Sequence, residues 1–150
     1  MTPRTGVGRA LLLGGLVVGV LDLTAACVTN YLRAGIGPVR VFHSVASGLL
    51  GPKSFEGGVP TAALGILLHF VIAFGATAVY VAASRKLRFL VEHPVICGLL
   101  YGVAVYAFMN SVVVPLSAAP FQIPYNLVGL TVHLFCIGLP IGLITARFAR

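Results

Sequence analysis

The chain has 150 residues, of which 59% are hydrophobic and only 9% are charged, and it carries a net charge of +7. Its mean hydropathy of +1.05 excludes an ordinary soluble domain of this length. The composition therefore predicts one all-α integral membrane domain. A helix needs about 20 residues to cross a bilayer core, and four apolar stretches meet that requirement: residues 10–32, 60–83, 94–114 and 126–146.

The first stretch holds Asp22 inside the apolar run "GGLVVGVLDLTAACVTN". This pattern allows two interpretations, a lipoprotein signal cleaved before Cys27 or a transmembrane helix with an acid near its middle. Asp22 interrupts the apolar region five residues before the cysteine, and Thr24 stands where such signals usually have leucine. The apolar run also continues to Leu32. These departures favour a transmembrane helix.

The loop after the first span contains "GPVRVFHSVASGLLGP", with Gly-Pro at both ends. Helical spacing within residues 38–50 predicts a short amphipathic helix lying flat in the membrane interface. Its apolar face is formed by Phe42, Val45 and Leu49. Its polar face is formed by Arg40, His43 and Ser47. The segment is either a connector with a solvated histidine or a lid over an outer site that His43 contacts.

Short motifs recur in the two halves of the chain. "GLVVGV" at residues 15–20 matches "GLLYGV" at 98–103, and "GILLH" at 65–69 matches "GLTVH" at 129–133. Each half then reads as one hairpin, with a glycine pair on its first helix and Gly-x-x-x-His on its second. The pattern predicts two tandem hairpins in the same orientation, related by an axis along the membrane normal.

This arrangement places three ionisable residues at one depth. Counted from the outer helix ends at 1.5 Å per residue, His69 and His133 lie about 10 to 14 Å deep and Asp22 about 15 Å deep. Each shares a helix face with small residues, which let transmembrane helices approach closely. The glycines expected at the packing surfaces are Gly15, Gly19, Gly65, Gly98, Gly102 and Gly129. We therefore expect an intramembrane polar layer that points inward.

Three roles for this layer remain open. In a proton- or ion-linked conduit or small carrier, Asp22 titrates and the histidines relay protons. In a redox protein, His69 and His133 are axial ligands of a haem, or bind a metal together with Asp22 and Cys136. In a structural protein, the layer only fixes helix packing. No arrangement typical of a catalytic nucleophile or a phosphate-binding loop is present, so we do not expect an enzyme.

Basic residues predict the orientation in the membrane. Seven of the ten fall on the side that holds both termini and the second loop: Arg4, Arg9, Arg85, Lys86, Arg88, Arg147 and Arg150. Cytoplasmic loops are enriched in Lys and Arg, so both termini should be cytoplasmic. The partner indicated by this charge is the lipid bilayer and not nucleic acid.

Four spans are few for a carrier, so the sequence is also compatible with a homodimer that places two copies side by side. Cys27, Cys97 and Cys136 differ in depth and are expected to be free thiols.

Three segments resemble a group of small, four-helix bacterial inner-membrane proteins without an assigned activity. They are "SVASGLLG", "GGVPTAALGILLHFVIAFG" and "YGVAVYAFMNSVVVPLSA", and the likeness extends over nearly the whole chain. The resemblance implies a bacterial inner membrane and four spans, and it implies no activity.

Overall fold

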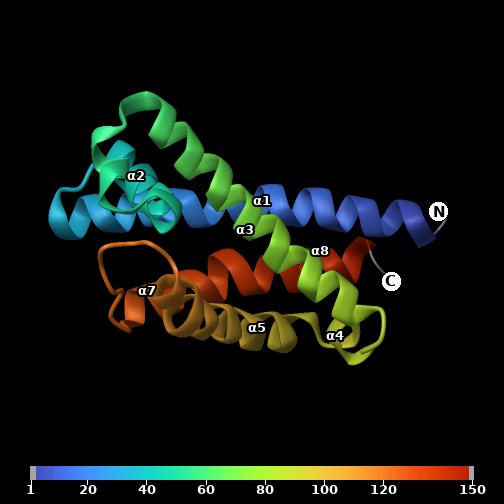
Figure 1. Cartoon of the computed structure of the whole chain (residues 1–150). Helices are drawn as coiled ribbons and strands as arrows, with labels where there is room; N and C mark the ends of the chain where they lie inside the picture. Colours follow the sequence, from blue (N-terminus) through green and yellow to red (C-terminus); the bar gives the residue numbers. More distant parts are fainter. Residues whose placement is uncertain (1–2, 149–150) are drawn as a thin grey trace.

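A computed structural model describes residues 3–148, with side chains from residue 6 onward. These residues are almost entirely helical and contain no strand. Figure 1 shows the helices running along one long axis, with both ends of the chain at the same end of the molecule. Four helices are long and apolar enough to cross a membrane: Gly6–Ala34, Gly58–Ser84, Pro94–Leu116 and Leu127–Phe148. The prediction of four apolar spans is confirmed, with every end within four residues of its predicted position.

The first half of the chain forms a long helix, a short returning segment and a second long helix. Its elements are α1 (Pro3–Ala34), α2 (Pro38–Leu50), the 3₁₀ helix η1 (Gly51–Glu56) and α3 (Gly58–Ser84). Helix α1 ends where Gly35 adopts a φ of 66°, and the Gly35 amide donates to the Tyr31 carbonyl. Helix α2 begins at Pro38, which needs no amide partner there, and ends at Gly51 with a φ of 65°. Both left-handed turns favour glycine.

The second half contains helices interrupted by wider π-helical turns. Its elements are α4 (Phe89–Glu92), α5 (Pro94–Phe108), the π helix η2 (Met109–Val113), α6 (Val114–Leu116), α7 (Leu127–Val132), the π helix η3 (His133–Gly138) and α8 (Leu139–Phe148). The third span therefore includes η2, and the fourth includes η3. Such π segments often mark functional sites in helices, and the sequence analysis did not predict either one.

The spans pack so that α1 contacts both α3 and α8, while α5 contacts η3 and α8. Helix α3 crosses the bundle obliquely, so that it approaches α4 at one end and lies with α2 at the other (Figure 1). The buried core lies toward the end that holds the termini and joins three spans through Val18, Ala73, Tyr80, Ile137 and Ile141. The opposite half of the bundle, near α2 and α7, is where the candidate site lies.

The orientation of α2 differs from the sequence-based expectation. The helix forms as predicted, but His43 is only 8% exposed and Ser47 is fully buried, whereas Leu49 is 62% exposed. His43 and Ser47 are turned inward because α2 packs along α3, where the His43 Nε2 atom lies 2.9 Å from the Gly58 carbonyl oxygen, whereas Arg40 of the same predicted face is exposed. Of the two interpretations of this segment, the one with a solvated His43 is therefore wrong.

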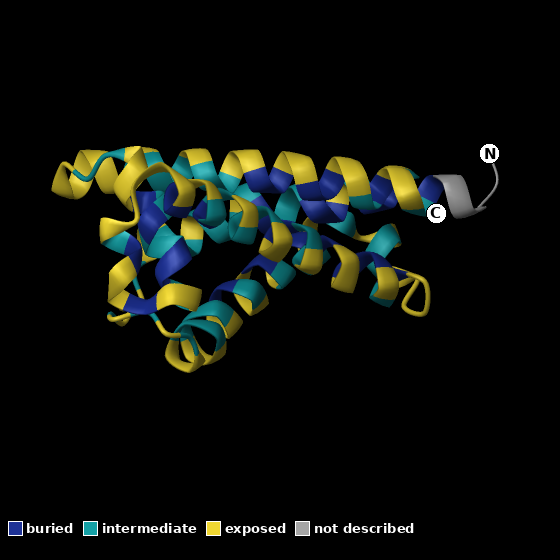
Figure 2. Cartoon of the chain, turned by 45° about the horizontal axis from the view of Figure 1, so that its top comes forward, coloured by how far each residue is buried: buried dark blue, intermediate teal, exposed yellow. Residues whose placement is uncertain are grey.

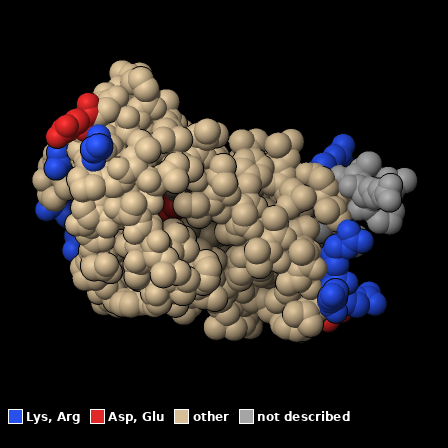
Figure 3. Space-filling view, viewed as in Figure 1, with Lys and Arg blue, Asp and Glu red and all other residues tan. Residues whose placement is uncertain are grey.

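The outward faces of the bundle are apolar. Leu12, Leu67, Val79 and Leu100 are each more than half exposed, and Figure 2 shows exposed residues along the outer side of α1 with buried residues beneath them. A surface of this kind would be unfavourable in water but matches hydrocarbon. The lysines and arginines that Figure 3 displays gather instead at the two ends of the molecule.

Candidate functional site

The Asp22 carboxylate lies beside His69 in the interior of the bundle. Asp22 is on α1 and His69 is on α3, and their Oδ2 and Nε2 atoms are 3.8 Å apart. The Asp22 side chain is 20% exposed and the His69 side chain is 12% exposed. An acid in a membrane span normally pairs with another polar group, because an isolated charge in hydrocarbon is costly. His69 is that partner for Asp22.

His69 also contacts the backbone of α1. Its Nε2 atom lies 3.0 Å from the carbonyl oxygen of Gly19, and because a carbonyl can only accept, Nε2 carries the hydrogen. Gly19 permits the close approach at this level: a Cβ there would come 2.4 to 2.5 Å from the Phe70 ring on α3. His69 therefore contacts α1 at two points, the Gly19 carbonyl and the Asp22 carboxylate, and these contacts fix the register of α1 against α3.

His133 approaches the same carboxylate from the fourth span. It begins the π segment η3, and its Nδ1 atom donates to the Gly129 carbonyl one turn earlier, at 2.8 Å. Its ring packs against Tyr106 of α5, with 4.9 Å between ring centres. The carboxylate of Asp22 interacts electrostatically with both His69 and His133. Three spans thus bring together the three residues that the sequence analysis placed in one layer.

These side chains line a cavity of about 740 Å³ in the half of the bundle near α2 and α7. Its walls come from α1, α2, α3, α5, η2, α7, η3 and the loop before α7, and they are largely aliphatic. In Figure 3 a small acidic area is visible at the bottom of a hollow in the uncharged face. Asp22 is the only Asp or Glu among the cavity-lining residues. The volume is in the range of small-molecule sites, which span about 300 to 1,000 Å³.

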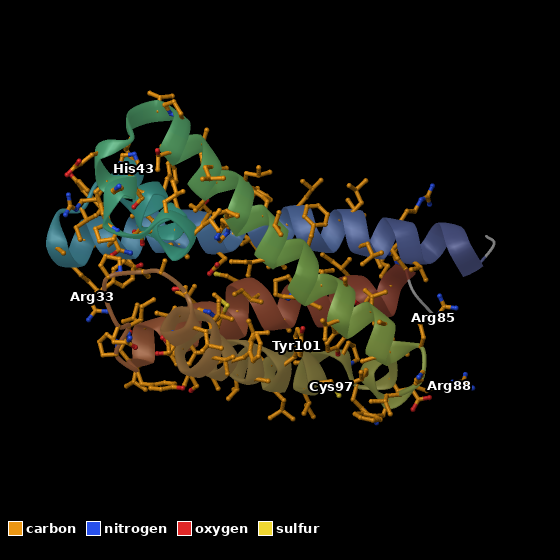
Figure 4. The ribbon with its side chains drawn as sticks, in the orientation of Figure 1. Arg33, His43, Arg85, Arg88, Cys97 and Tyr101 are labelled. Atoms are coloured by element: carbon orange, nitrogen blue, oxygen red, sulfur yellow. The ribbon has the colours of Figure 1, made fainter. Side chains whose placement is uncertain are left out.

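Further polar residues in the cavity were not identified in the sequence. The Tyr106 hydroxyl accepts from the Asn126 amide at 2.7 Å and donates to the Asn126 carbonyl at 3.0 Å. Asn126 in turn starts α7, because its Oδ1 atom accepts from the Gly129 amide at 2.8 Å. At the outer end, the Arg33 Nη1 atom lies 3.4 Å from the same Oδ1 atom, and Figure 4 shows Arg33 at the end of the molecule opposite Arg85 and Arg88.

Asn110 is a cavity residue with one buried polar atom left without a partner among the described residues. It lies in the π segment η2, and its Nδ2 atom donates to the Tyr106 carbonyl at 2.8 Å. Its Oδ1 atom is buried without a hydrogen-bond partner among residues 3–148. Such an acceptor is costly unless something donates to it. An asparagine inside the apolar run "YAFMNSVVV" was the sequence signal that could have identified it.

The structure places the four candidate metal ligands in one region without forming a ligand set. Asp22, His69 and His133 line the cavity and Cys136 does not, and the described residues include no group of three or more His, Cys, Asp or Glu side chains arranged to hold a metal ion. Each histidine already has one ring nitrogen bonded to a backbone carbonyl. Ligation of a haem through His69 Nε2 would require that ring to leave Gly19. All three cysteines are free, as expected.

The glycines expected at packing surfaces lie at close helix contacts. In the second half the contact is between backbones, because a Cβ on Gly98 or Gly102 would come 2.7 Å from the Gly138 carbonyl or 2.6 Å from the His133 carbonyl. In the first half, Gly15 faces the ring of Phe74 and Gly65 faces the backbone of Phe42. Gly19 lies beside His69, and Gly102 lies beside His133. The two glycines occupy matching positions in the repeated motifs, and so do the two histidines. Gly129 packs against Tyr106.

Comparisons of the chain with protein families, curated proteins and solved structures find no match. This outcome is consistent with the resemblance to a group of small membrane proteins without an assigned activity.

Proposed function

We propose that this chain is a small proton-linked carrier in a bacterial inner membrane, in which the Asp22–His69 pair exchanges the proton and also conducts it when no substrate is bound. The observation that carries the proposal is the 3.8 Å approach of the Asp22 carboxylate to the His69 imidazole at the wall of a cavity of about 740 Å³. Ionisable residues inside membrane spans usually mark ion or proton pathways. A carboxylate beside an imidazole can pass a proton with little movement, since both groups bind and release it.

The shape of the cavity supports access from one side only. Its lining continues to the outer loop, including Ser117, Phe121 and Gln122. Toward the other side, the cavity ends at Val18, and Tyr80 and Ile141 beyond it are buried in the core. A carrier alternates between states open to opposite sides, and this arrangement has the features of the outward-open one.

The proposal also includes the membrane topology, the hairpin arrangement and the oligomeric state of the protein. We place both termini in the cytoplasm, because Arg9, Arg85, Lys86, Arg88 and Arg147 share one side of the sequence topology. The matched glycine and histidine positions support two tandem hairpins. We propose a homodimer embedded in the bilayer, since two copies would supply eight helices around the transport path, and we propose neither an enzymatic activity nor nucleic-acid binding.

Proton flux into proteoliposomes tests the proposal. A potassium diffusion potential, negative inside, would drive protons inward, and a trapped pH-sensitive dye would report them. We expect acidification above that of protein-free liposomes for the wild type and background flux for Asp22→Asn. Glu56→Gln is the matched control, because Glu56 is an exposed acid outside the cavity, and it should conduct like the wild type.

Two results would overturn the proposal. Wild-type flux no greater than that of protein-free liposomes would show that the layer conducts no protons. Equal flux in the wild type and in correctly folded Asp22→Asn would show that Asp22 is not the exchanging group. In either case the proposed proton exchange at Asp22 would be wrong, and the redox and structural roles would remain as the alternatives.

A further inference from the structure

We propose that the cavity binds a lipophilic ammonium ion, an apolar body carrying a positive N–H group, with that group at Asp22. The inference rests on the proposed function and names the class of substrate that exchanges with the proton. It follows from three features of the cavity: the chemistry of its walls, the polar atoms that remain unpaired in it, and the side from which it opens.

The walls predict the apolar part of the ligand. Ile72 of α3, Val105 of α5, Val113 of η2 and Val132 of α7 all line the cavity and contribute only aliphatic surface. A ligand with a hydrocarbon body would remove this surface from any water in the cavity, which is favourable in proportion to the area covered. A small polar metabolite would leave these walls without a matching surface.

The polar atoms predict the charged part. Asp22 is the only acid in the lining, and Asn110 contributes a buried Oδ1 atom that accepts no hydrogen bond from the described residues. Both are acceptors, so the matching group on a ligand is a donor with positive charge. The ring of Tyr106 also lines the cavity, and aromatic faces attract cations. Arg33, the one Lys or Arg in the lining, lies at the outer end with its Nη1 atom against Asn126.

The position of the opening predicts entry from the membrane. The hollow over the acidic area in Figure 3 lies in the uncharged face of the molecule, between the charged ends. Ile72 and Val128 line the cavity and are 40% and 41% exposed, and exposed aliphatic side chains of the spans face hydrocarbon in a spanning protein. A lipophilic ammonium ion partitions into the outer leaflet and can reach Asp22 sideways without passing Arg33. Its positive charge then takes the place of the proton that the proposed function assigns to the Asp22–His69 pair, which links binding to proton release.

Binding of a matched pair of amphiphiles to the purified full-length protein tests this inference. The probes are 1-adamantylammonium and 1-adamantanecarboxylate, which share a rigid apolar cage and carry opposite charges. Equilibrium dialysis in detergent, with protein-free micelles as blank, should show saturable binding of the ammonium ion and none of the carboxylate. Asp22→Asn should bind the ammonium ion at least about tenfold more weakly, because a charge-assisted hydrogen bond is lost.

Two variants control for indirect effects. Asp22→Glu keeps the charge and should retain binding, while Glu56→Gln removes an acid outside the cavity and should bind like the wild type. Should Asp22→Asn fail to fold, as thermal unfolding would reveal, the two probes on the wild type still decide the question. Equal binding of both probes, no binding of the ammonium ion, or undiminished binding by folded Asp22→Asn would each overturn the inference.

The outcome is distinguishable from that of the proton-flux experiment, which contains no ligand. Proton flux that depends on Asp22 without ammonium binding would contradict the substrate class and leave the proposed proton pathway in place. Ammonium binding that depends on Asp22, in a protein that conducts no protons, would support the binding site and contradict the proton linkage.

Discussion

At the scale of single residues, the Asp22–His69 pair shows how the protein keeps a carboxylate in an apolar span. The two side chains lie on different helices at 3.8 Å, and His69 is held in place by the Gly19 carbonyl at 3.0 Å. The backbone contact positions the imidazole whether or not Asp22 is charged. The contact between α1 and α3 therefore does not depend on the charge of Asp22.

Thermal unfolding in detergent of Asp22→Asn, His69→Ala and the double variant should reveal coupling between the two residues. We expect the effects of the single changes to differ from additivity by about 0.5 to 3 kcal/mol, as found for residues in direct contact. His69→Ala should be the more destabilising change, because it also leaves the Gly19 carbonyl without its side-chain donor. Strictly additive effects would show that the 3.8 Å approach carries no interaction energy.

The sequence predicted this pair because depth in a membrane can be counted along a helix. Asp22, His69 and His133 were assigned to one layer from the 1.5 Å rise per residue, and all three line one cavity. Asn110 and Tyr106 were missed for a different reason. Their position depends on the π segment η2 and on a hydrogen bond to Asn126, and the 3.6-residue period of an α-helix indicates neither feature.

At the scale of elements, the two halves use glycine differently. In the second half, α5 meets η3 and α8 backbone to backbone, and Gly138 lies directly against the Gly98 carbonyl and the Gly102 backbone. In the first half, α1 meets aromatic rings of α3, such as Phe74 against Gly15. A ring can rotate or shift slightly, whereas a backbone cannot move without moving its helix. The second half should therefore tolerate less change.

Gly138→Ala tests this difference. A Cβ at residue 138 would collide with backbone atoms of α5, so we expect destabilisation of about 1 to 3 kcal/mol, the usual result of overpacking. Gly75→Ala is the matched control, because nothing lies within 4 Å of a Cβ there and alanine favours the helix. Chemical or thermal unfolding of both variants in the same detergent measures the contrast. Equal stability of the two variants would contradict the close packing of α5 against η3.

A hydrogen bond between the halves joins α3 to α5. The Tyr101 hydroxyl donates to the Ala76 carbonyl at 2.7 Å, and Figure 4 shows Tyr101 between these helices. Tyr101→Phe should lower the free energy of unfolding by about 1 kcal/mol, because it removes one interhelical hydrogen bond. Tyr31→Phe should have little effect, since Tyr31 is 62% exposed and its hydroxyl has no partner among the described residues. A loss of similar size in both variants would argue against the role of Tyr101.

The inverted face of α2 shows where sequence patterns mislead at this scale. An amphipathic helix in water or at an interface turns its polar side outward, which led to the expectation of a solvated His43. Helix α2 instead lies against α3, so His43 donates inward to Gly58 and Leu49 is exposed on the outside. The pattern correctly predicted a helix over residues 38–50. The direction of its faces depended on which neighbour it packs against, and the sequence of the segment does not contain that information.

At the scale of the whole molecule, the bilayer explains why the spans were predictable. Their lengths follow from the hydrocarbon thickness, and each predicted end lies within four residues of the observed one. The cavity was not predictable in this way. Helix α3 runs obliquely across the bundle (Figure 1). It therefore diverges from the other spans at the end near α2 and α7, while the Tyr101 hydroxyl joins α5 to α3 nearer the middle of the bundle.

The orientation of the molecule gives the last prediction. Lys and Arg lie at both ends of the bundle (Figure 3), and those of the sequence fall seven on the side of the termini and three, Arg33, Arg40 and Lys53, on the other. Because basic loops are retained in the cytoplasm, residues 85–93 and both termini should be cytoplasmic, and residues 33–59 and 117–125 periplasmic. Alkaline phosphatase, which is active only in the periplasm, should be active when fused after Leu32 or Pro120 and inactive after Lys86 or Arg150. Green fluorescent protein, which matures in the cytoplasm, should give the complementary pattern. Phosphatase activity after Lys86 would reverse the orientation and turn the half of the bundle that holds the cavity toward the cytoplasm, so that the proposed ligand would enter from the inner leaflet.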